Sequence, residues 1–190
     1  GGGRDLIFPH HTNEIAQSQA GTGSSFAHFW LHSEHLQVDG QKMAKSAGNF
    51  FTLRNLIDKG YEAIAIRYLM ISVPYRKQLN FTFDGLHQAN QSLGRIKDFL
   101  FRLKSTSLPA GDNAEIVQSL EDAKADFETG LDDDLNTAQS LAAVFDFIRV
   151  GNTALDNEAF KCEDRKAVID WFEEIDRRLG IVPPVENSKQ

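Results

Sequence analysis

The sequence has a single cysteine, Cys162, in 190 residues. One cysteine cannot form an internal disulfide or, by itself, a thiolate metal cage, so a disulfide-stabilised secreted scaffold and a self-contained zinc finger are excluded. The sequence also lacks any apolar run near the roughly 20 residues of a membrane helix, and it does not open with the basic and then apolar residues of a signal peptide. These absences predict a cytoplasmic protein from a reducing compartment.

An initiator methionine is missing as well, and three glycines, an unusual start for a fold, open the chain. We therefore expect a fragment of a longer protein. Hydrophobic residues account for 41% of the sequence and charged residues for 25%. This balance excludes collagen and disorder, and the length is enough for one large or two small cores.

The net charge of −7 is distributed unevenly along the chain. Residues 40–104 contain eleven Lys or Arg and four Asp or Glu. Residues 105–190 contain eight Lys or Arg and nineteen Asp or Glu. The first segment therefore carries a charge of +7 and the second a charge of −11. A basic block of this kind predicts contact with a polyanion such as a nucleic acid, although pairing with the acidic segment inside the fold would produce the same pattern.

Short apolar runs and turn formers alternate up to about residue 51. Residues 6–8 have the pattern of a strand that ends at a proline, and residues 13–20 can form a helix that glycines terminate. Residues 36–38 alternate like a strand and lead into Asp39-Gly40, a strong hairpin signal. The basic residues 42–46 should then lie in the loop after the hairpin.

Helical patterns dominate the rest of the sequence. Thr52 can cap a first helix, and a stripe of apolar residues predicts a long helix that begins at Thr82 or Asp84 and stops before a linker at 105–112. The predicted helices span 53–59, 62–73, 84–104, 114–128, 135–150 and 163–179. The second half of the chain therefore predicts a helical bundle.

His10 and Glu14 are four residues apart at the start of a predicted helix, so both project from one face within reach of a single ion. Zinc accepts imidazole nitrogen and carboxylate oxygen, but a closed tetrahedral site needs two more ligands, which no Cys or His pair elsewhere in the chain supplies. From spacing alone, these two residues are either half of a metal site or an ordinary surface pair.

Lys42 and Lys45 occur among small residues, the composition of a loop that closes over phosphates. Lysine acts in such a loop as a mobile point charge that stabilises charge on a transferring phosphate. A basic surface turn is the alternative interpretation. Gly2 and Gly3 could likewise bring backbone close to a nucleotide, with Asp5 accepting hydrogen bonds from ribose hydroxyls.

Three consecutive aspartates, residues 132–134, lie between two predicted helices. A calcium loop that starts at Asp132 would need Gly at its sixth position and Glu at its twelfth, where the sequence has Thr137 and Ala143. We therefore expect the acidic run to cap and charge the N-terminus of the following helix. No base is identified near Cys162, which we interpret as structural or incidental.

Several of these motifs together resemble one known family. Residues 2–18 resemble the G-G-x-D-L-x-F-P-H-H-E-N-E-x-A-Q-S block of cysteinyl-tRNA synthetases, and residues 42–46 resemble the K-M-S-K-S loop of class I synthetases at a matching interval downstream. Shorter strings are also similar to this family, at residues 67–68, 75–76, 78–81 and 131–137. The resemblance covers nearly the whole chain.

This resemblance implies a mixed, mostly α fold, in which the C-terminal piece of a Rossmann-like class I catalytic domain is followed by an α-helical bundle. It implies an enzyme that uses ATP, with Mg²⁺, to activate cysteine to cysteinyl-adenylate and then transfers the cysteinyl group to tRNA(Cys). By position, Lys42 and Lys45 match the catalytic lysines, and Lys45, Asp5, Gly2 and Gly3 match residues that face ATP.

The family holds a zinc ion with two cysteines, a histidine and a glutamate, and the substrate thiolate binds that zinc. His10 and Glu14 match the last two ligands, whereas both cysteines and the H-I-G-H motif that contacts ATP would precede Gly1. We therefore expect the isolated chain to be inactive. Three positions depart from the family pattern, namely Thr12, Ala44 and Ala47. Both lysines of the phosphate loop are retained.

The resemblance also implies a division into four parts. Residues 1–51 would be the end of the catalytic domain with its phosphate loop, 52–108 the stem-contact or connecting helices, 109–182 a helical bundle of the tRNA-binding type, and 183–190 a flexible tail. Arg54, Arg76 and Lys77 lie within the basic block just after predicted helix ends, and we expect them to contact tRNA. We also expect a monomer.

Two other functions fit parts of the pattern. A related ligase joins cysteine to an amino sugar in thiol-cofactor synthesis with a similar zinc site, but a small sugar does not need the basic block. A non-catalytic RNA-binding module fits the length of the chain, whereas Lys42, Lys45, His10 and Glu14 argue against it.

Overall fold

The computed structural model describes residues 1–185 and separates the chain into two compact units. Unit 1 comprises Gly1–Phe50 and Val73–Thr82, and unit 2 comprises Phe51–Ser72 and Phe83–Gln190. Residues 186–190, which make up most of the tail predicted at 183–190, lie outside the described residues. Within residues 1–185, no helix is both long enough and apolar enough to cross a membrane.

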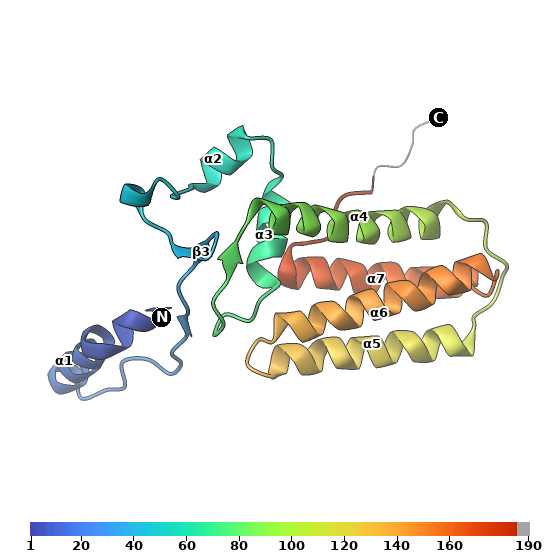
Figure 1. Ribbon diagram of the computed structural model, residues 1–190. Helices are drawn as coiled ribbons and strands as arrows, with labels where there is room; N and C mark the ends of the chain where they lie inside the picture. Colours follow the sequence, from blue (N-terminus) through green and yellow to red (C-terminus); the bar gives the residue numbers. More distant parts are fainter. Residues whose placement is uncertain (186–190) are drawn as a thin grey trace. The chain divides into compact units, whose positions relative to one another are not determined.

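Unit 1 consists of short strands, tight helical turns and one longer helix (Figure 1). Strand β1 (Gly2–Gly3) pairs in parallel with β2 (His32–Ser33), and β3 (Gln37–Val38) lies between β4 (Gln41–Lys42) and β5 (Asn80–Phe81). The helical elements are η1 (Arg4–Leu6), η2 (Ile7–His11), α1 (Thr12–Thr22) and η3 (Lys45–Ala47). Helix α1 ends at Gly23, whose left-handed backbone (φ 68°) closes the last turn as the glycine signal predicted.

The hairpin predicted at Asp39-Gly40 is confirmed. Strands β3 and β4 pair antiparallel, and the two residues that connect them have positive φ values of 50° and 74°. This is the geometry of a two-residue turn whose twist matches the flanking strands. Lys42 is therefore part of strand β4, and the predicted loop begins one residue later.

The strand predicted at residues 6–8 is wrong, because the chain coils there. The turns η1 and η2 follow each other directly, and within them Phe8 alone has extended backbone angles (φ −132°, ψ 131°). Strand β2 pairs with Gly2 and Gly3 instead. A run of three apolar residues is compatible with both a strand and a helical turn, so the sequence alone could not predict which of them forms at residues 6–8.

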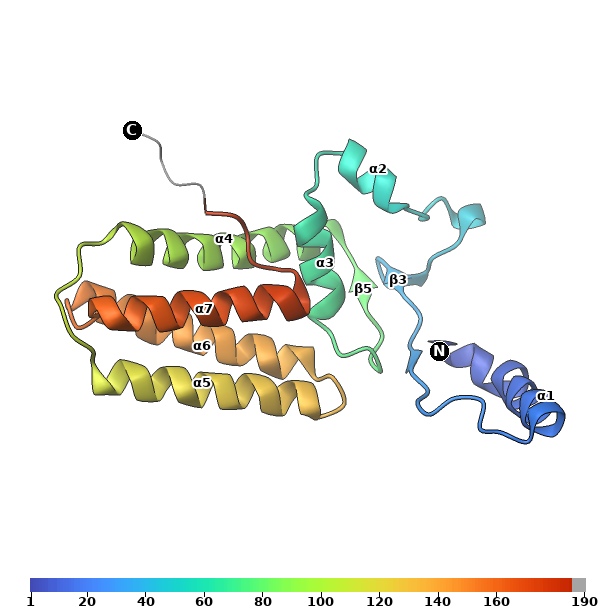
Figure 2. The same cartoon turned by 180° about the vertical axis from the view of Figure 1, so that it is seen from behind.

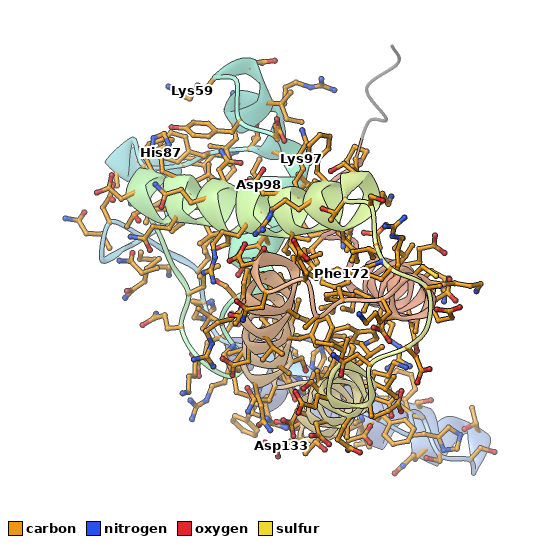
Figure 3. All side chains as sticks on the ribbon, turned by 90° about the vertical axis from the view of Figure 1, so that its right-hand side faces the viewer. Lys59, His87, Lys97, Asp98, Asp133 and Phe172 are labelled. Atoms are coloured by element: carbon orange, nitrogen blue, oxygen red, sulfur yellow. The ribbon has the colours of Figure 1, made fainter. Side chains whose placement is uncertain are left out.

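Unit 2 is helical, as predicted. It contains α2 (Leu53–Asp58), α3 (Ala63–Ile71), α4 (Phe83–Ser105), α5 (Ala114–Asp132), α6 (Thr137–Asp156) and α7 (Cys162–Leu179). Figures 1 and 2 show α5, α6 and α7 side by side, with α4 next to them. Figure 3 looks along α5, α6 and α7 and shows that α4 crosses them obliquely.

Aromatic rings fill the interior of this bundle. Phe99 of α4, Phe147 of α6 and Phe172 of α7 are each at most 2% exposed. The ring centroid of Phe99 lies 6.2 Å from that of Phe147 and 5.7 Å from that of Phe172, at separations typical of favourable aromatic pairs. Figure 3 shows Phe172 in the space beneath α4. The apolar stripe predicted for the long helix is thus buried against the other helices.

The first helix of unit 2 begins where the sequence predicted. The backbone N–H of Asn55 donates to Oγ1 of Thr52 (3.1 Å), and the backbone N–H of Thr52 donates to Oδ1 of Asn55 (3.0 Å). This reciprocal arrangement satisfies two donors at the helix start. Helix α2 then ends before Gly60, which has a φ of 89°.

The acidic run at 132–134 does not cap the following helix, contrary to the prediction. Asp132 is the last residue of α5, and Asp133 is its C-cap. The N-cap of α6 is Asn136, whose side-chain oxygen accepts a hydrogen bond from the backbone N–H of Gln139 (3.4 Å). Asp and Asn are equally good N-caps, so composition alone could not fix which of them starts the helix.

Candidate active site

The turn that begins with Gly2 and Gly3 leaves little space for a side chain at either glycine. Both residues pair in parallel with strand β2. A Cβ atom on Gly3 would lie 2.5 Å from Oδ1 of Asp5, so the Asp5 carboxylate lies against strand β1. The side chain of Asp5 is 59% exposed, and its Oδ1 lies 3.6 Å from Nε2 of His35. An exposed carboxylate can accept hydrogen bonds from the hydroxyls of a ribose.

His10 and Glu14 lie on either side of the junction between η2 and α1, and both are exposed. Their donor atoms, an imidazole nitrogen and a carboxylate oxygen, are of the types that zinc binds, so the pair fits half of a zinc site. Within residues 1–185, no group of three or more His, Cys, Asp or Glu residues is arranged to hold a metal ion. A complete site would need further ligands.

A histidine pair that no sequence pattern indicated lies beside the glycine turn. Nδ1 of His11 and Nε2 of His32 are 2.8 Å apart, a hydrogen-bond distance. The ring of Trp30 lies 4.8 Å from that of His11 and is stacked on that of His32. Burial, followed by the electrostatic interaction with the neighbouring ring of His11, lowers the pKa of His32. The two histidines are 21 residues apart, so only the folded chain brings them together.

The loop with the two lysines is braced by Asn49, which the sequence did not single out. The backbone N–H of Ala44 donates to Oδ1 of Asn49 (2.9 Å), and Nδ2 of Asn49 donates to the carbonyl oxygen of Lys42 (3.1 Å). Lys45 starts η3, and its Nζ lies 5.4 Å from the centroid of the Phe50 ring. Both lysines are exposed, so their ammonium groups are available to a phosphate.

The three residues predicted to contact tRNA are exposed and belong to different units. Arg54 is the second residue of α2 in unit 2, so its predicted place after a helix end is wrong. Arg76 and Lys77 lie in a turn of unit 1, in which the backbone N–H of Lys77 donates to the carbonyl oxygen of Pro74 (2.8 Å). The Arg76 guanidinium lies 5.1 Å from the ring centroid of Tyr75.

Two family models match the chain. Residues 1–91 match the model described as the catalytic domain of class I (C) tRNA synthetases. Residues 126–182, which run from α5 to just beyond α7, match the DALR domain. The order of the two matches confirms the predicted fold class, a catalytic-domain segment followed by a helical domain.

Known proteins are similar over nearly the whole chain. The cysteine–tRNA ligase of Solibacter usitatus is 46% identical over 187 residues, that of Koribacter versatilis 45% over 188, and that of Chlamydia abortus 46% over 186. These alignments cover 98%, 99% and 96% of the chain, but 40%, 38% and 38% of the relatives. The chain thus spans about two fifths of the length of these ligases. None of the three is an amino-sugar ligase, so the comparisons do not favour that alternative.

Proposed function

The chain belongs to the cysteinyl-tRNA synthetase family of class I enzymes, and on this premise we propose that it forms part of a cysteine–tRNA ligase. Such an enzyme activates cysteine with ATP to cysteinyl-adenylate and transfers the cysteinyl group to the terminal ribose of tRNA(Cys). One observation carries the proposal: unit 1 combines the glycine turn and its carboxylate, the His10–Glu14 pair and the braced loop with two lysines.

The groups of unit 1 have separate roles in adenylation. The carboxylate of cysteine attacks the α-phosphorus of ATP, and pyrophosphate leaves. Lys42 and Lys45 stabilise the charge that grows on the phosphates, because their exposed ammonium groups can approach the substrate from the braced loop. Gly2 and Gly3 have no side chains to keep the nucleotide away from the backbone of β1, and Asp5 holds the ribose.

His10 and Glu14 would hold the zinc ion together with two cysteines from the upstream part of the enzyme. When bound, zinc supplies a soft cation that prefers a thiolate to the hydroxyl of serine. Cysteine and serine are close in shape, so a pocket alone would separate them weakly. His10 and Glu14 therefore serve the selection of cysteine rather than the phosphate chemistry.

The proposal assigns tRNA contact to the basic block, with Arg76 and Lys77 in unit 1 and Arg54 in unit 2. Residues 1–51 complete the catalytic domain, 52–108 contact the acceptor stem, and 109–182 form the tRNA-binding bundle that ends in the tail 183–190. The enzyme acts as a monomer in the cytoplasm, with Mg²⁺ accompanying ATP.

Unit 1 has the surface of an incomplete domain, which supports the proposal that the catalytic centre needs more chain. Helix α1 has no buried residue, although a surface helix normally buries one face. Phe8 is 76% exposed and Phe29 86%. Strands β1 and β2 are two residues long, and parallel sheets are normally covered on both faces. We expect this 190-residue chain alone to catalyse no adenylation.

Cysteine-dependent ATP–pyrophosphate exchange tests the proposed function. The full-length enzyme that contains this segment should exchange pyrophosphate with cysteine, whereas the purified 190-residue chain should not. Exchange by the isolated chain would contradict the division of the site between this segment and upstream residues. Failure of the full-length enzyme to use cysteine would refute the ligase proposal.

The His10→Ala variant of the full-length enzyme tests the metal assignment. Loss of one ligand weakens the site, so zinc content, cysteine binding and the preference for cysteine over serine should all fall. His28→Ala removes another exposed histidine of unit 1 and serves as the control. Unchanged discrimination in His10→Ala would show that His10 is not a ligand.

A further inference from the structure

We infer that His11 and His32 form a positioning pair, which holds the start of helix α1 in fixed register with the strand pair β1–β2. The inference rests on the proposed function and goes beyond it, because neither histidine is among the groups assigned to zinc, ATP or tRNA. The start of α1 bears the candidate metal ligands His10 and Glu14. Strand β1 bears the candidate nucleotide turn.

The contact between the two rings joins these parts directly. His11 is the last residue of η2 and the N-cap of α1, and His32 is the first residue of β2, opposite Gly2. The 2.8 Å separation of Nδ1 of His11 and Nε2 of His32 therefore links the helix start to the strand pair. Among the described residues, no backbone hydrogen bond joins α1 to β2, so this side-chain contact links the two elements directly.

Packing leaves the two rings little freedom to separate. His11 is 9% exposed, and its ring centroid is 5.0 Å from that of His32 and 4.8 Å from that of Trp30. Trp30 is stacked on His32 with an angle of 2° between the ring planes. A Cβ atom on Gly2 would lie 3.3 Å from Cε1 of His11, so the ring also lies against the strand.

The hydrogen bond between the rings needs one donor and one acceptor. One imidazole donates its N–H and the other accepts with its unprotonated nitrogen, so a ring without nitrogen cannot replace either partner. Replacing His32 by phenylalanine would keep a ring of similar shape stacked on Trp30 and leave Nδ1 of the buried His11 unpaired. Glutamine has an amide close to the position of Nε2 and can keep the bond.

The His11–His32 pair would affect catalysis because one substrate is held beside the start of α1 and the other beside the strand pair β1–β2. Cysteine is held from the α1 side, and ATP from the β1 side. Each substrate can bind to its own part when the link is lost, but the attacking carboxylate and the α-phosphorus are then poorly aligned. A misplacement of about 1 Å can cost on the order of 10²-fold in rate.

Kinetics of the full-length enzyme separate this role from others. In ATP–pyrophosphate exchange, His32→Phe should lower kcat by about 10- to 100-fold, with the KM values for cysteine and ATP within about 2-fold of wild type. His32→Gln should recover most of the lost rate. His28→Phe introduces the same ring at an exposed histidine of unit 1 and should behave as wild type. Zinc content should be equal in all four proteins.

An unchanged kcat in His32→Phe would overturn the inference. A rise in the KM of one substrate alone, without recovery in His32→Gln, would also overturn it, because it would assign His32 to direct binding. The hydrogen bond can be observed without activity, as a ¹⁵N–¹⁵N coupling between the two rings in the full-length enzyme labelled with ¹⁵N at histidine. The coupling should vanish in His32→Phe, and its absence from the wild type would exclude the pair even if the ligase proposal holds.

Discussion

Lys45 stands at the start of η3 with its ammonium group exposed to water. Water screens such a charge in the free enzyme, so the contact of the Lys45 ammonium group with the triphosphate contributes little to the binding free energy of ATP. Charge that develops on the phosphates during adenylation, in a site that excludes water, gains far more from the same ammonium group. The residue should therefore act on the transition state.

Replacing Lys45 by alanine in the full-length enzyme should lower kcat for cysteine-dependent pyrophosphate exchange by a factor on the order of 10² to 10³, with little change in the KM for ATP. Lys97→Ala, on the outer face of α4, removes another lysine of the basic block and should leave both constants unchanged (Figure 3). A pure rise in the KM for ATP would instead assign Lys45 to ground-state binding.

Local motifs indicated the candidate residues of the site, but not the contacts that hold them. The two lysines and the His10–Glu14 pair are visible as spacings within a few residues. Asn49, which braces the lysine loop, acts through two backbone groups that the spacing of side chains does not reveal. The contact between His11 and His32 depends on the pairing of β1 with β2, and two-residue strands leave no periodic signal.

At the scale of elements, helices were predicted where start and stop signals are local. Thr52 and Gly60 bound α2 in sequence and in structure, because capping and positive φ are properties of single residues. The predictions at 6–8 and 132–134 failed where the choice between elements depends on a distant partner or on neighbouring residues of equal capping strength. Longer helices were predicted well because their apolar stripes repeat over several turns.

The packing of α4 against α6 depends on Gly151. A Cβ atom at this position would lie 2.7 Å from Cε2 and 2.8 Å from Cζ of Phe99. The Phe99 ring is buried between Phe147 and Phe172 and cannot move aside freely. We expect Gly151→Ala to lower the free energy of unfolding by about 1 to 3 kcal/mol, as measured by urea denaturation of the 190-residue chain.

Gly94, in α4, provides the matched control because a Cβ atom there would meet no atom within 4 Å. Alanine has a higher helix propensity than glycine, so Gly94→Ala should raise the free energy of unfolding by up to about 1 kcal/mol. The same propensity gain acts at Gly151 and is outweighed there by the clash. Stabilisation by both substitutions would show that Phe99 can repack.

For the whole molecule, the uneven charge is the feature most relevant to tRNA. Ion pairs within the acidic segment engage several of its basic residues, as in Lys124–Glu121, Arg149–Asp146, Lys166–Asp170 and Arg178–Glu174. Arg102 of the basic block pairs with Asp156 of the acidic segment, so a part of the block is neutralised within the fold. Lys77 and Arg54, by contrast, are exposed at the surface of their units.

Salt dependence of tRNA binding tests whether the basic block contacts the phosphate backbone. Each phosphate contact releases counterions, so affinity should fall steeply with salt, and loss of one contact should reduce the slope of log affinity against log salt concentration by about one unit. We expect this reduction for Arg76→Ala in the full-length enzyme. Arg177→Ala, an exposed arginine of α7 in the acidic segment, should leave the slope unchanged.

The slopes for Arg76→Ala and Arg177→Ala together show whether Arg76 alone or the whole basic block is wrongly assigned to tRNA contact. Equal slopes for the wild type and Arg76→Ala would remove Arg76 from the interface while leaving Lys77 and Arg54 to be tested in the same way. A larger reduction for Arg177→Ala than for Arg76→Ala would place the phosphate contacts on the helices that carry the −11 charge. Binding would then depend on a few arginines held on an acidic surface, and the sign of a segment's net charge would not predict where tRNA binds.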